Sequence, residues 1–183
     1  IDWKAYARTD RLMVRRWHDD RQLPIALLLD TSGSMAYGAP AKGGVARMTA
    51  AILGLLAFDQ GDKVRVFLSG KVARVEPTMP EQLCEALCSV ADVGDAAAAH
   101  LLGLATERLA QRHVVILLSD LLDDPATLIT AAAALTARGH ELACLQILDR
   151  SELTLPRQWG PTRFSDPEGR TGALEGDAND LAD

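Results

Sequence analysis

The stretch Ile25-Ala-Leu-Leu-Leu-Asp30-Thr-Ser-Gly-Ser34 decides the fold of this 183-residue chain. Its aliphatic residues run without alternation and end at an aspartate, which is the pattern of a strand buried on both faces of a sheet. A second run, Val114-Val-Ile-Leu-Leu-Ser-Asp120, ends in the same way. The two runs therefore predict two central strands of a parallel sheet.

Helical and extended patterns alternate around these two runs. Helices are predicted at residues 47–58, 80–90, 96–111 and 125–138, and further strands at 12–17, 64–68, 71–76 and 141–148. In the first helix, Met48, Ile52, Leu55 and Leu56 form one apolar stripe, and in the second Leu83, Leu87 and Val90 face inward. The alternation predicts an α/β fold, a doubly wound and mostly parallel central sheet with helices on both faces.

The chain divides into three predicted segments. Residues 1–24 form an N-terminal segment with an edge strand, residues 25–150 form the α/β core, and residues 151–183 form an acidic tail. In the tail, residues 162–166 and 171–174 flank Pro167-Glu-Gly-Arg170 and predict a small β-hairpin.

Charge and hydropathy argue against binding to nucleic acid or to an anionic membrane and against a membrane-spanning helix. The net charge is −6, which disfavours binding to nucleic acid or to an anionic membrane surface. No apolar run approaches the roughly 20 residues that a membrane-spanning helix needs. We therefore expect no membrane segment in this chain and a cytoplasmic location.

Polar residues follow both central strands at the edge where an open α/β sheet binds ligands. Because parallel strands end at the same edge, Asp30 and Asp120 are expected to lie close together. Ser32 and Ser34 follow Asp30 on a tight glycine-containing turn, so both hydroxyls can point back toward its carboxylate. Hard oxygen ligands of this kind suit Mg²⁺ or Mn²⁺, and these four residues predict a divalent-metal site.

Two resemblances add to this prediction. Asp30-x-Ser32-x-Ser34 resembles the metal-ion-dependent adhesion site of von Willebrand factor type A domains, and Ser119-Asp120 resembles the later metal-site aspartate of that family. The run Ile1-Asp-Trp-Lys-Ala-Tyr-Ala-Arg-Thr9 resembles the bacterial domain-of-unknown-function family number 58. The tail sequence Gly160-Pro-Thr-Arg-Phe164, followed by an Asp-x-Glu turn, resembles the same family.

The resemblance implies a von Willebrand factor A fold, which is Rossmann-like, and a non-catalytic, metal-dependent protein-interaction module. It also implies a protein partner, because such proteins act with MoxR-type AAA+ ATPases in the assembly or maturation of other proteins.

The sequence departs from the type A pattern at one position. That site usually has a threonine on a further loop, but the corresponding stretch here is Asp92-Val-Gly-Asp95-Ala-Ala97. Asp95 either caps the helix that starts at Ala96 or also reaches the metal. In the second case three carboxylates would leave the loaded site at about −1, which would disfavour an acidic partner residue.

Two other classes of function stay open from sequence. One is a Mg²⁺-dependent phosphoryl-transfer or hydrolytic enzyme with Asp30 as nucleophile, and the other is a structural domain with a vestigial metal site. An aspartyl-phosphate enzyme would need a second acid two residues after the nucleophile, and that position is Ser32. We therefore expect that the chain is not an enzyme.

Overall fold

The computed structural model describes residues 23–68, 75–91, 98–153, 162–164 and 174–176. The strands are β1 (Ile25–Leu29), β2 (Val64–Leu68), β3 (Val114–Ser119), β4 (Glu141–Gln146), β5 (Thr162–Phe164) and β6 (Leu174–Gly176). The helices are η1 (Gly33–Ala36), α2 (Lys42–Asp59), α3 (Pro80–Cys88), α4 (Ala98–Arg108), α5 (Pro125–Ala137) and α6 (Arg150–Leu153). The predicted strand at 12–17 lies outside the described residues.

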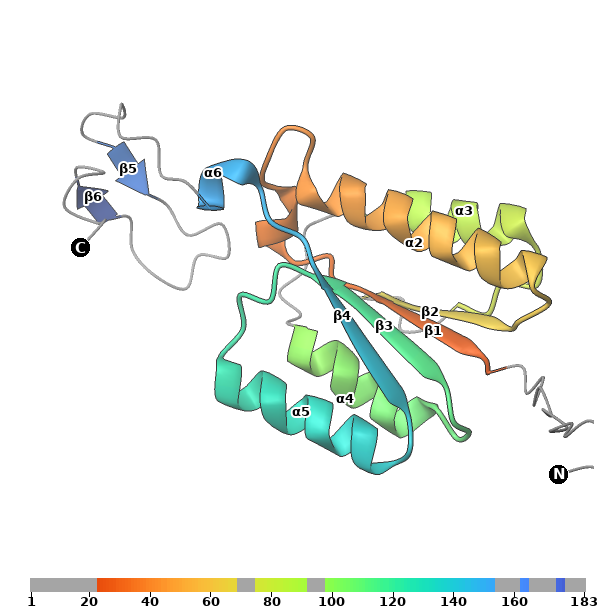
Figure 1. Cartoon of the computed structure of the whole chain (residues 1–183). Coiled ribbons are helices and arrows are strands. Elements are labelled where there is room, and N and C mark those ends of the chain that lie inside the picture. The colour runs from red at the N-terminus through yellow and green to blue at the C-terminus, as the bar shows by residue number, and fades with distance from the viewer. Residues whose placement is uncertain (1–22, 69–74, 92–97, 154–161, 165–173, 177–183) are drawn as a thin grey trace, which may run out of the picture.

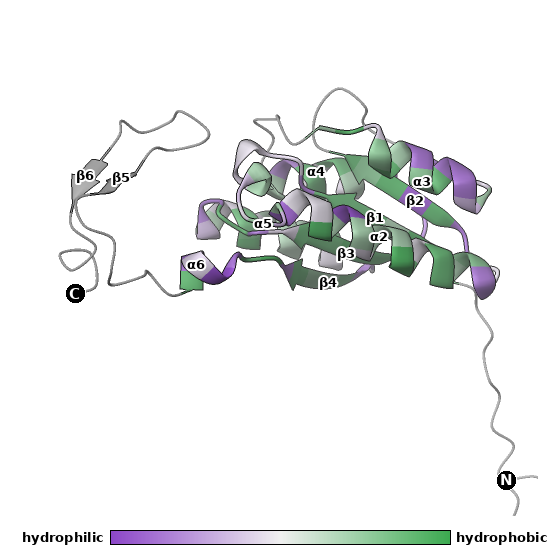
Figure 2. Cartoon of the chain, turned by 90° about the horizontal axis from the view of Figure 1, so that it is seen from above, coloured by the Kyte–Doolittle hydropathy of each residue, from purple (hydrophilic) through white to green (hydrophobic). Residues whose placement is uncertain are grey.

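Strands β1 to β4 form one parallel sheet in the order β2-β1-β3-β4. In this sheet Leu29 at the end of β1 lies opposite Leu68 of β2 and Leu118 of β3. The two runs that end in aspartate are therefore adjacent central strands, as predicted. Figure 2 shows how strongly hydrophobic the strands are.

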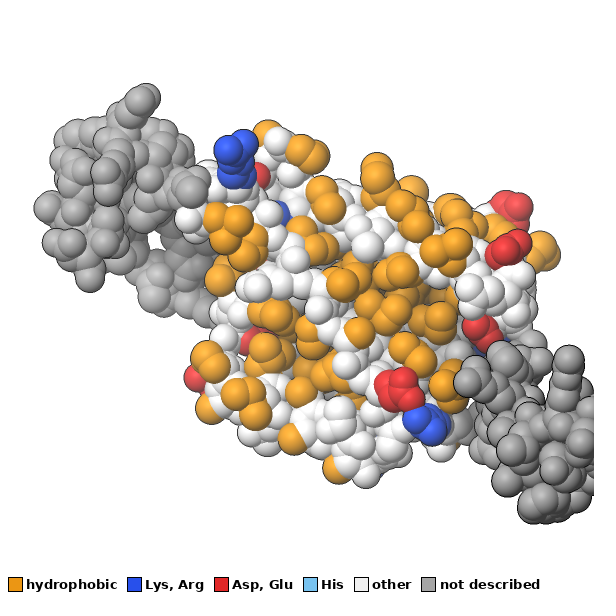
Figure 3. Space-filling view, viewed as in Figure 1, with side chains coloured by type: hydrophobic (Ala, Val, Ile, Leu, Met, Phe, Trp, Pro, Cys, Tyr) orange, Lys and Arg blue, Asp and Glu red, His pale blue; other side chains and the backbone are white. Residues whose placement is uncertain are grey.

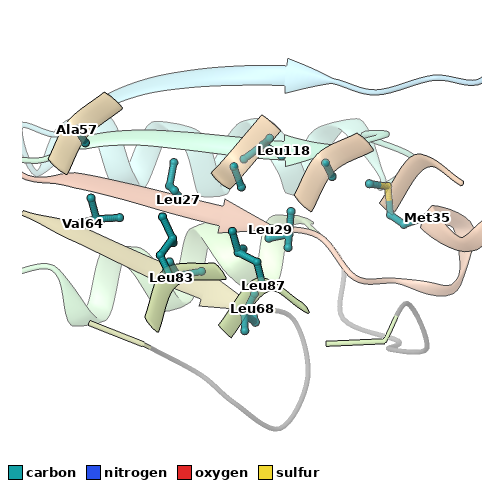
Figure 4. Close-up of a cluster of buried hydrophobic side chains, with 12 residues drawn as sticks. Leu27, Leu29, Met35, Ala57, Val64, Leu68, Leu83, Leu87 and Leu118 are labelled. Carbon is teal, nitrogen blue, oxygen red and sulfur yellow. The ribbon is translucent and has the colours of Figure 1, made fainter. Parts of the chain in front are cut away.

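Both faces of the sheet are covered by helices. Figure 1 shows α2 and α3 on one face and α4 and α5 on the other. Successive residues of a strand point to opposite faces, so Leu27 and Leu29 pack beneath α2 and α3 (Figure 4), whereas Ala26 and Leu28 pack against α4 and α5. The doubly wound α/β architecture predicted from sequence is confirmed.

Helix α2 differs from its prediction in two ways. It begins at Lys42 instead of residue 47, and its large apolar stripe faces away from the sheet. The exposed fractions are 68% for Met48, 53% for Ile52, 40% for Leu55 and 53% for Leu56. The buried face consists of small residues, which are Ala46, Ala50, Gly54 and Ala57.

The small residues let α2 pack closely against its neighbours. A Cβ added at Gly54 would lie only 2.3 Å from Cδ2 of Leu83, a buried residue of α3. The helix is therefore apolar on both sides. Figure 3 shows the resulting hydrophobic side chains across the face formed by α2 and the β4 edge.

Strands β2 and β4 and helices α3, α4 and α5 lie within a few residues of their predicted ranges, whereas η1 and α6 were not predicted. Leu83 and Leu87 are buried, and Val90 packs against the same core. In the described part of the predicted strand at 71–76, Val75 forms an antiparallel bridge with Val66 of β2. Strands β5 and β6 pair antiparallel, with β6 beginning at Leu174 where the predicted strand ended. In the described ranges no helix has the length and apolar character to span a bilayer.

Candidate metal centre

Asp30 directly follows β1 and its carboxylate is held from two sides. Its backbone N–H donates to the carbonyl oxygen of Leu118 at 3.0 Å, which ties the ends of β1 and β3 together. Its Oδ1 accepts the Ser32 N–H at 2.9 Å, and its Oδ2 accepts the Ser119 hydroxyl at 2.6 Å. Only 3% of Asp30 is exposed, so the orientation of the carboxylate is fixed within the fold.

The two serines of the motif lie side by side. Ser32 precedes the short helix η1 and Ser34 lies within it, and their Oγ atoms are 3.1 Å apart. Both residues are buried, with 3% and 5% of their surface exposed. The turn after β1 therefore brings two hydroxyl oxygens together, and Ser32 also hydrogen-bonds to the Asp30 carboxylate.

Asp120 reaches the same edge of the sheet from the end of β3. Its Oδ2 accepts the ammonium of Lys42 at 2.9 Å, and its Oδ1 accepts a long hydrogen bond of 3.4 Å from the Leu122 N–H. Its backbone carbonyl accepts the side-chain amide of Gln146 at 3.1 Å. Asp120 is 2% exposed, so both aspartates are buried at one edge of the sheet.

The electrostatics of the site oppose a charge on Asp30. Burial raises the pKa of the Asp30 carboxyl, hydrogen bonds from Ser119 and Ser32 lower it, and the nearby charge of Asp120 raises it further. The net effect is a raised pKa. Two buried carboxylates close together are a recognised feature of functional sites, because a cation placed between them would relieve the repulsion.

Lys42 is a further residue of the site, and no sequence motif indicated it. Its side chain is 2% exposed, and its Nζ lies 2.9 Å from Asp120 and 2.6 Å from Oε1 of Glu152 in α6. Burial lowers the pKa of Lys42, but the hydrogen bonds that its ammonium donates to Glu152 and Asp120 raise it more, so the net pKa is raised. The sequence signal is weak: Lys42 is the single charged residue between Asp30 and Val45.

Two further aspartates near the site serve as helix caps. The carboxylate of Asp124 accepts the Thr127 N–H at 2.9 Å and caps α5. The carboxylate of Asp123 accepts the Ala99 N–H at 2.7 Å in the first turn of α4, so the two neighbouring aspartates serve different helices. Asp95 lies outside the described residues.

The donor set has the chemistry that a hard divalent cation needs. Within the described ranges there is no group of three or more His, Cys, Asp or Glu that could hold a metal, so the hydroxyls of Ser32 and Ser34 would have to contribute. Two carboxylates and two hydroxyls are oxygen donors suited to Mg²⁺ or Mn²⁺. Lys42 is different, because its ammonium is positively charged and cannot ligate a metal, yet it donates a hydrogen bond to one oxygen of Asp120.

The chain has an α/β fold with a parallel sheet covered by helices on both faces, and this fold resembles that of a von Willebrand factor type A domain. The chain belongs to the family described as "Protein of unknown function DUF58", whose sequence model matches residues 1–178. No curated protein matches the chain by sequence.

Solved structures share this fold at low sequence identity. An aerotolerance-related membrane protein from Bacteroides fragilis NCTC 9343 is 16% identical, with a TM-score of 0.58 over 87% of this chain and 83% of that one. The conserved hypothetical protein BatB from Bacteroides thetaiotaomicron is 20% identical, with a TM-score of 0.53 over 68% and 66%. The SpRpn10 VWA domain is 15% identical, with a TM-score of 0.53 over 72% and 78%.

Proposed function

We propose that this chain is a non-catalytic protein-interaction module whose binding depends on Mg²⁺ or Mn²⁺ held by Asp30, Ser32, Ser34 and Asp120. The observation that carries the proposal is the contact between the two serine hydroxyls, 3.1 Å apart beside a carboxylate that is fixed at both oxygens. These hydroxyls lie at the carboxyl edge of the sheet, which is where open α/β folds bind ligands.

A bound cation would supply a coordination position for an oxygen group of the partner. The chain's own residues would orient it: Asp30 and Asp120 carry the negative charge, and the serines complete the hard-oxygen set. Asp95 has two alternative roles in this proposal. It is either a further metal ligand or only the cap of the helix that follows it. Replacing Asp95 with Thr tests the two roles, since metal affinity and acidic-peptide binding both stay unchanged if Asp95 is only a cap.

The non-catalytic part of the proposal is supported by the residue two positions after Asp30. An enzyme that forms an aspartyl phosphate needs a second acid there, but the residue is Ser32, whose N–H donates to Oδ1 of Asp30 and whose hydroxyl contacts that of Ser34. We expect no hydrolysis of p-nitrophenyl phosphate or p-nitrophenyl acetate with Mg²⁺ present. Turnover that disappears in Asp30→Asn would favour the enzyme alternative instead.

The partner class is a protein, and we propose a MoxR-type AAA+ ATPase on the basis of the family resemblance. The surface next to the site supports a protein contact, because α2 starts at Lys42 and exposes Val45 and Met48 in its first turns. Large exposed apolar side chains that form a continuous patch are typical of protein-binding surfaces.

Metal dependence is tested by thermal unfolding with increasing Mg²⁺ or Mn²⁺. A ligand that binds only the folded state at 100 times its Kd stabilises by about 2.7 kcal/mol, which corresponds to a rise in Tm of several degrees for a domain of this size. Asp30→Ala should lose this response while remaining folded. Asp124→Asn is the matched control, because it removes a carboxylate from the neighbouring loop and keeps a good helix cap.

Partner binding is tested by capture of the purified ATPase on the immobilised chain in Mg²⁺ and in EDTA. We expect capture in Mg²⁺ that is lost in EDTA and in Asp30→Ala. Capture that persists in EDTA would show that the interaction does not depend on the metal. Absence of capture under every condition would contradict the proposal of an AAA+ partner.

A further inference from the structure

Lys42 places a buried positive charge on the proposed metal site. The residue starts α2, and its side chain crosses to the carboxyl edge of the sheet, where Nζ donates to Oδ2 of Asp120 at 2.9 Å. Both side chains are 2% exposed. A buried ammonium needs such partners, since an unpaired buried charge is strongly destabilising.

The contact has a consequence for any cation that binds the site. Oδ2 of Asp120 is engaged by an ammonium, and Oδ1 accepts a long hydrogen bond of 3.4 Å from the Leu122 N–H. A divalent cation at the same carboxylate would lie within a few ångströms of the lysine charge. Like charges at this distance repel strongly in a partly buried site.

Lys42 has a second carboxylate that can hold it. Its Nζ donates to Oε1 of Glu152 at 2.6 Å, and Glu152 is 27% exposed. If Lys42 left Asp120, the ammonium would remain paired with Glu152. The segment that carries Glu152 is itself fixed near the site, because the Tyr37 hydroxyl lies 3.0 Å from the Ser151 hydroxyl.

We propose that the Lys42 ammonium competes with the divalent cation for Asp120, and that Glu152 sets the outcome by holding the lysine when it is displaced. Lys42 thus determines the metal affinity of the site, and Glu152 is the residue that makes metal binding possible. The inference rests on the proposed metal site and extends it.

The test is isothermal titration calorimetry of the full chain with MgCl₂ and with MnCl₂. Lys42→Met should raise the affinity by about tenfold or more, the scale on which the partners of metal ligands alter binding. Lys63→Met is the matched control, because it removes an exposed lysine at the opposite end of the sheet, at the start of β2. It should leave the affinity unchanged.

The Glu152→Gln variant should change the metal affinity in the opposite direction. Glu152 is partly exposed, so this substitution does not disturb a buried residue. With Glu152 neutral, Asp120 is the one carboxylate among the described residues that still accepts a hydrogen bond from Lys42, so the ammonium should stay on Asp120 and the metal affinity should fall. In a Lys42→Met background most of this loss should disappear. A loss of equal size in both backgrounds would mean that Glu152 acts only as a distant charge, and it would overturn the inference.

The outcomes separate this inference from the proposed function. Equal metal affinity in the wild-type chain and in Lys42→Met overturns the competition but leaves the metal site intact. Metal binding by Lys42→Met alone supports the competition and overturns metal dependence of the wild-type chain. If neither protein binds metal, both proposals are overturned.

Discussion

The hydroxyl of Ser119 donates to Oδ2 of Asp30 at 2.6 Å, although the two residues are 89 positions apart in the sequence. The same hydroxyl oxygen accepts the N–H of Leu121 at 2.9 Å. Ser119 thus connects the loop after β3 to the carboxylate that follows β1. It is fully buried, so no water replaces either bond if the hydroxyl is removed.

Ser119→Ala should lower both stability and metal affinity. Leaving buried hydrogen-bonding groups without their partner costs about 1–3 kcal/mol. The loss of the group that orients Asp30 should weaken metal binding by about 10- to 100-fold. Urea unfolding and calorimetry measure the two effects. Ser89→Ala, which removes an exposed hydroxyl bonded to the Ala86 carbonyl, is the control, and an equal result for both variants would contradict the role given to Ser119.

Asp30→Asn should stabilise the metal-free protein at neutral pH. The pKa of Asp30 is raised in the folded state, so its ionisation above that pKa opposes folding. The advantage of the asparagine variant should be largest at pH 7 and should shrink as the pH falls through the raised pKa toward 3.8, where the wild-type carboxyl is protonated. Unfolding free energies from pH 4 to 7 measure this difference. A variant less stable than wild type at pH 7 would contradict the electrostatic argument.

His140 should make the protein less stable as the pH falls below about 6.5. Burial and the charge of Arg138 lower the pKa of His140, and its Nδ1 accepts the His113 N–H at 3.3 Å, which requires an unprotonated nitrogen. As the pH falls, the unfolded chain therefore takes up the proton before the folded chain does, and the free energy of unfolding decreases. His140→Asn keeps an acceptor and should flatten the dependence between pH 7 and 5. The control is His100→Asn, which removes an exposed imidazole.

Gly54→Ala should be destabilising although it lies within a helix. Alanine favours a helix over glycine by about 1 kcal/mol, but the added methyl group would lie 2.3 Å from a buried Leu83 methyl. Overpacking of this kind costs about 1–3 kcal/mol. Gly103→Ala in α4 has no atom within 4 Å of its Cβ and should gain stability. Thermal unfolding of the two variants should give opposite signs, and a stabilised Gly54→Ala would show that α3 moves freely away from α2.

The sequence determined the central features of the fold. The runs before Asp30 and Asp120 are too short for buried helices and too uniformly apolar for a half-exposed strand, so their place in the middle of the sheet followed from composition alone. Because strand ends fix where the next residues lie, the grouping of Asp30, Ser32, Ser34 and Asp120 was predictable as well. These features depend on local pattern and on the general geometry of parallel sheets.

The orientation of α2 was decided only by tertiary packing. Periodicity identified a stripe of large apolar residues, but it could not say which side of the helix meets the sheet. The helix presents its small residues to the core because α3 approaches closely at Gly54. The start of α2 at Lys42 was hidden for a similar reason, since Gly43 and Gly44 are poor helix formers and hold a helical conformation within the packed fold.

The charge balance of the site was also decided by the tertiary structure. Lys42, Asp120 and Glu152 are separated by 78 and 110 positions, counted from Lys42, and no pattern in the sequence relates them. Sheet order, the start of α2 and the return of the chain after β4 bring them together. The sequence predicted the residues of the proposed metal site, because the spacing of Asp30, Ser32 and Ser34 is local. The position of Lys42 beside Asp120, from which we propose that it competes with the cation, follows from contacts between distant parts of the chain.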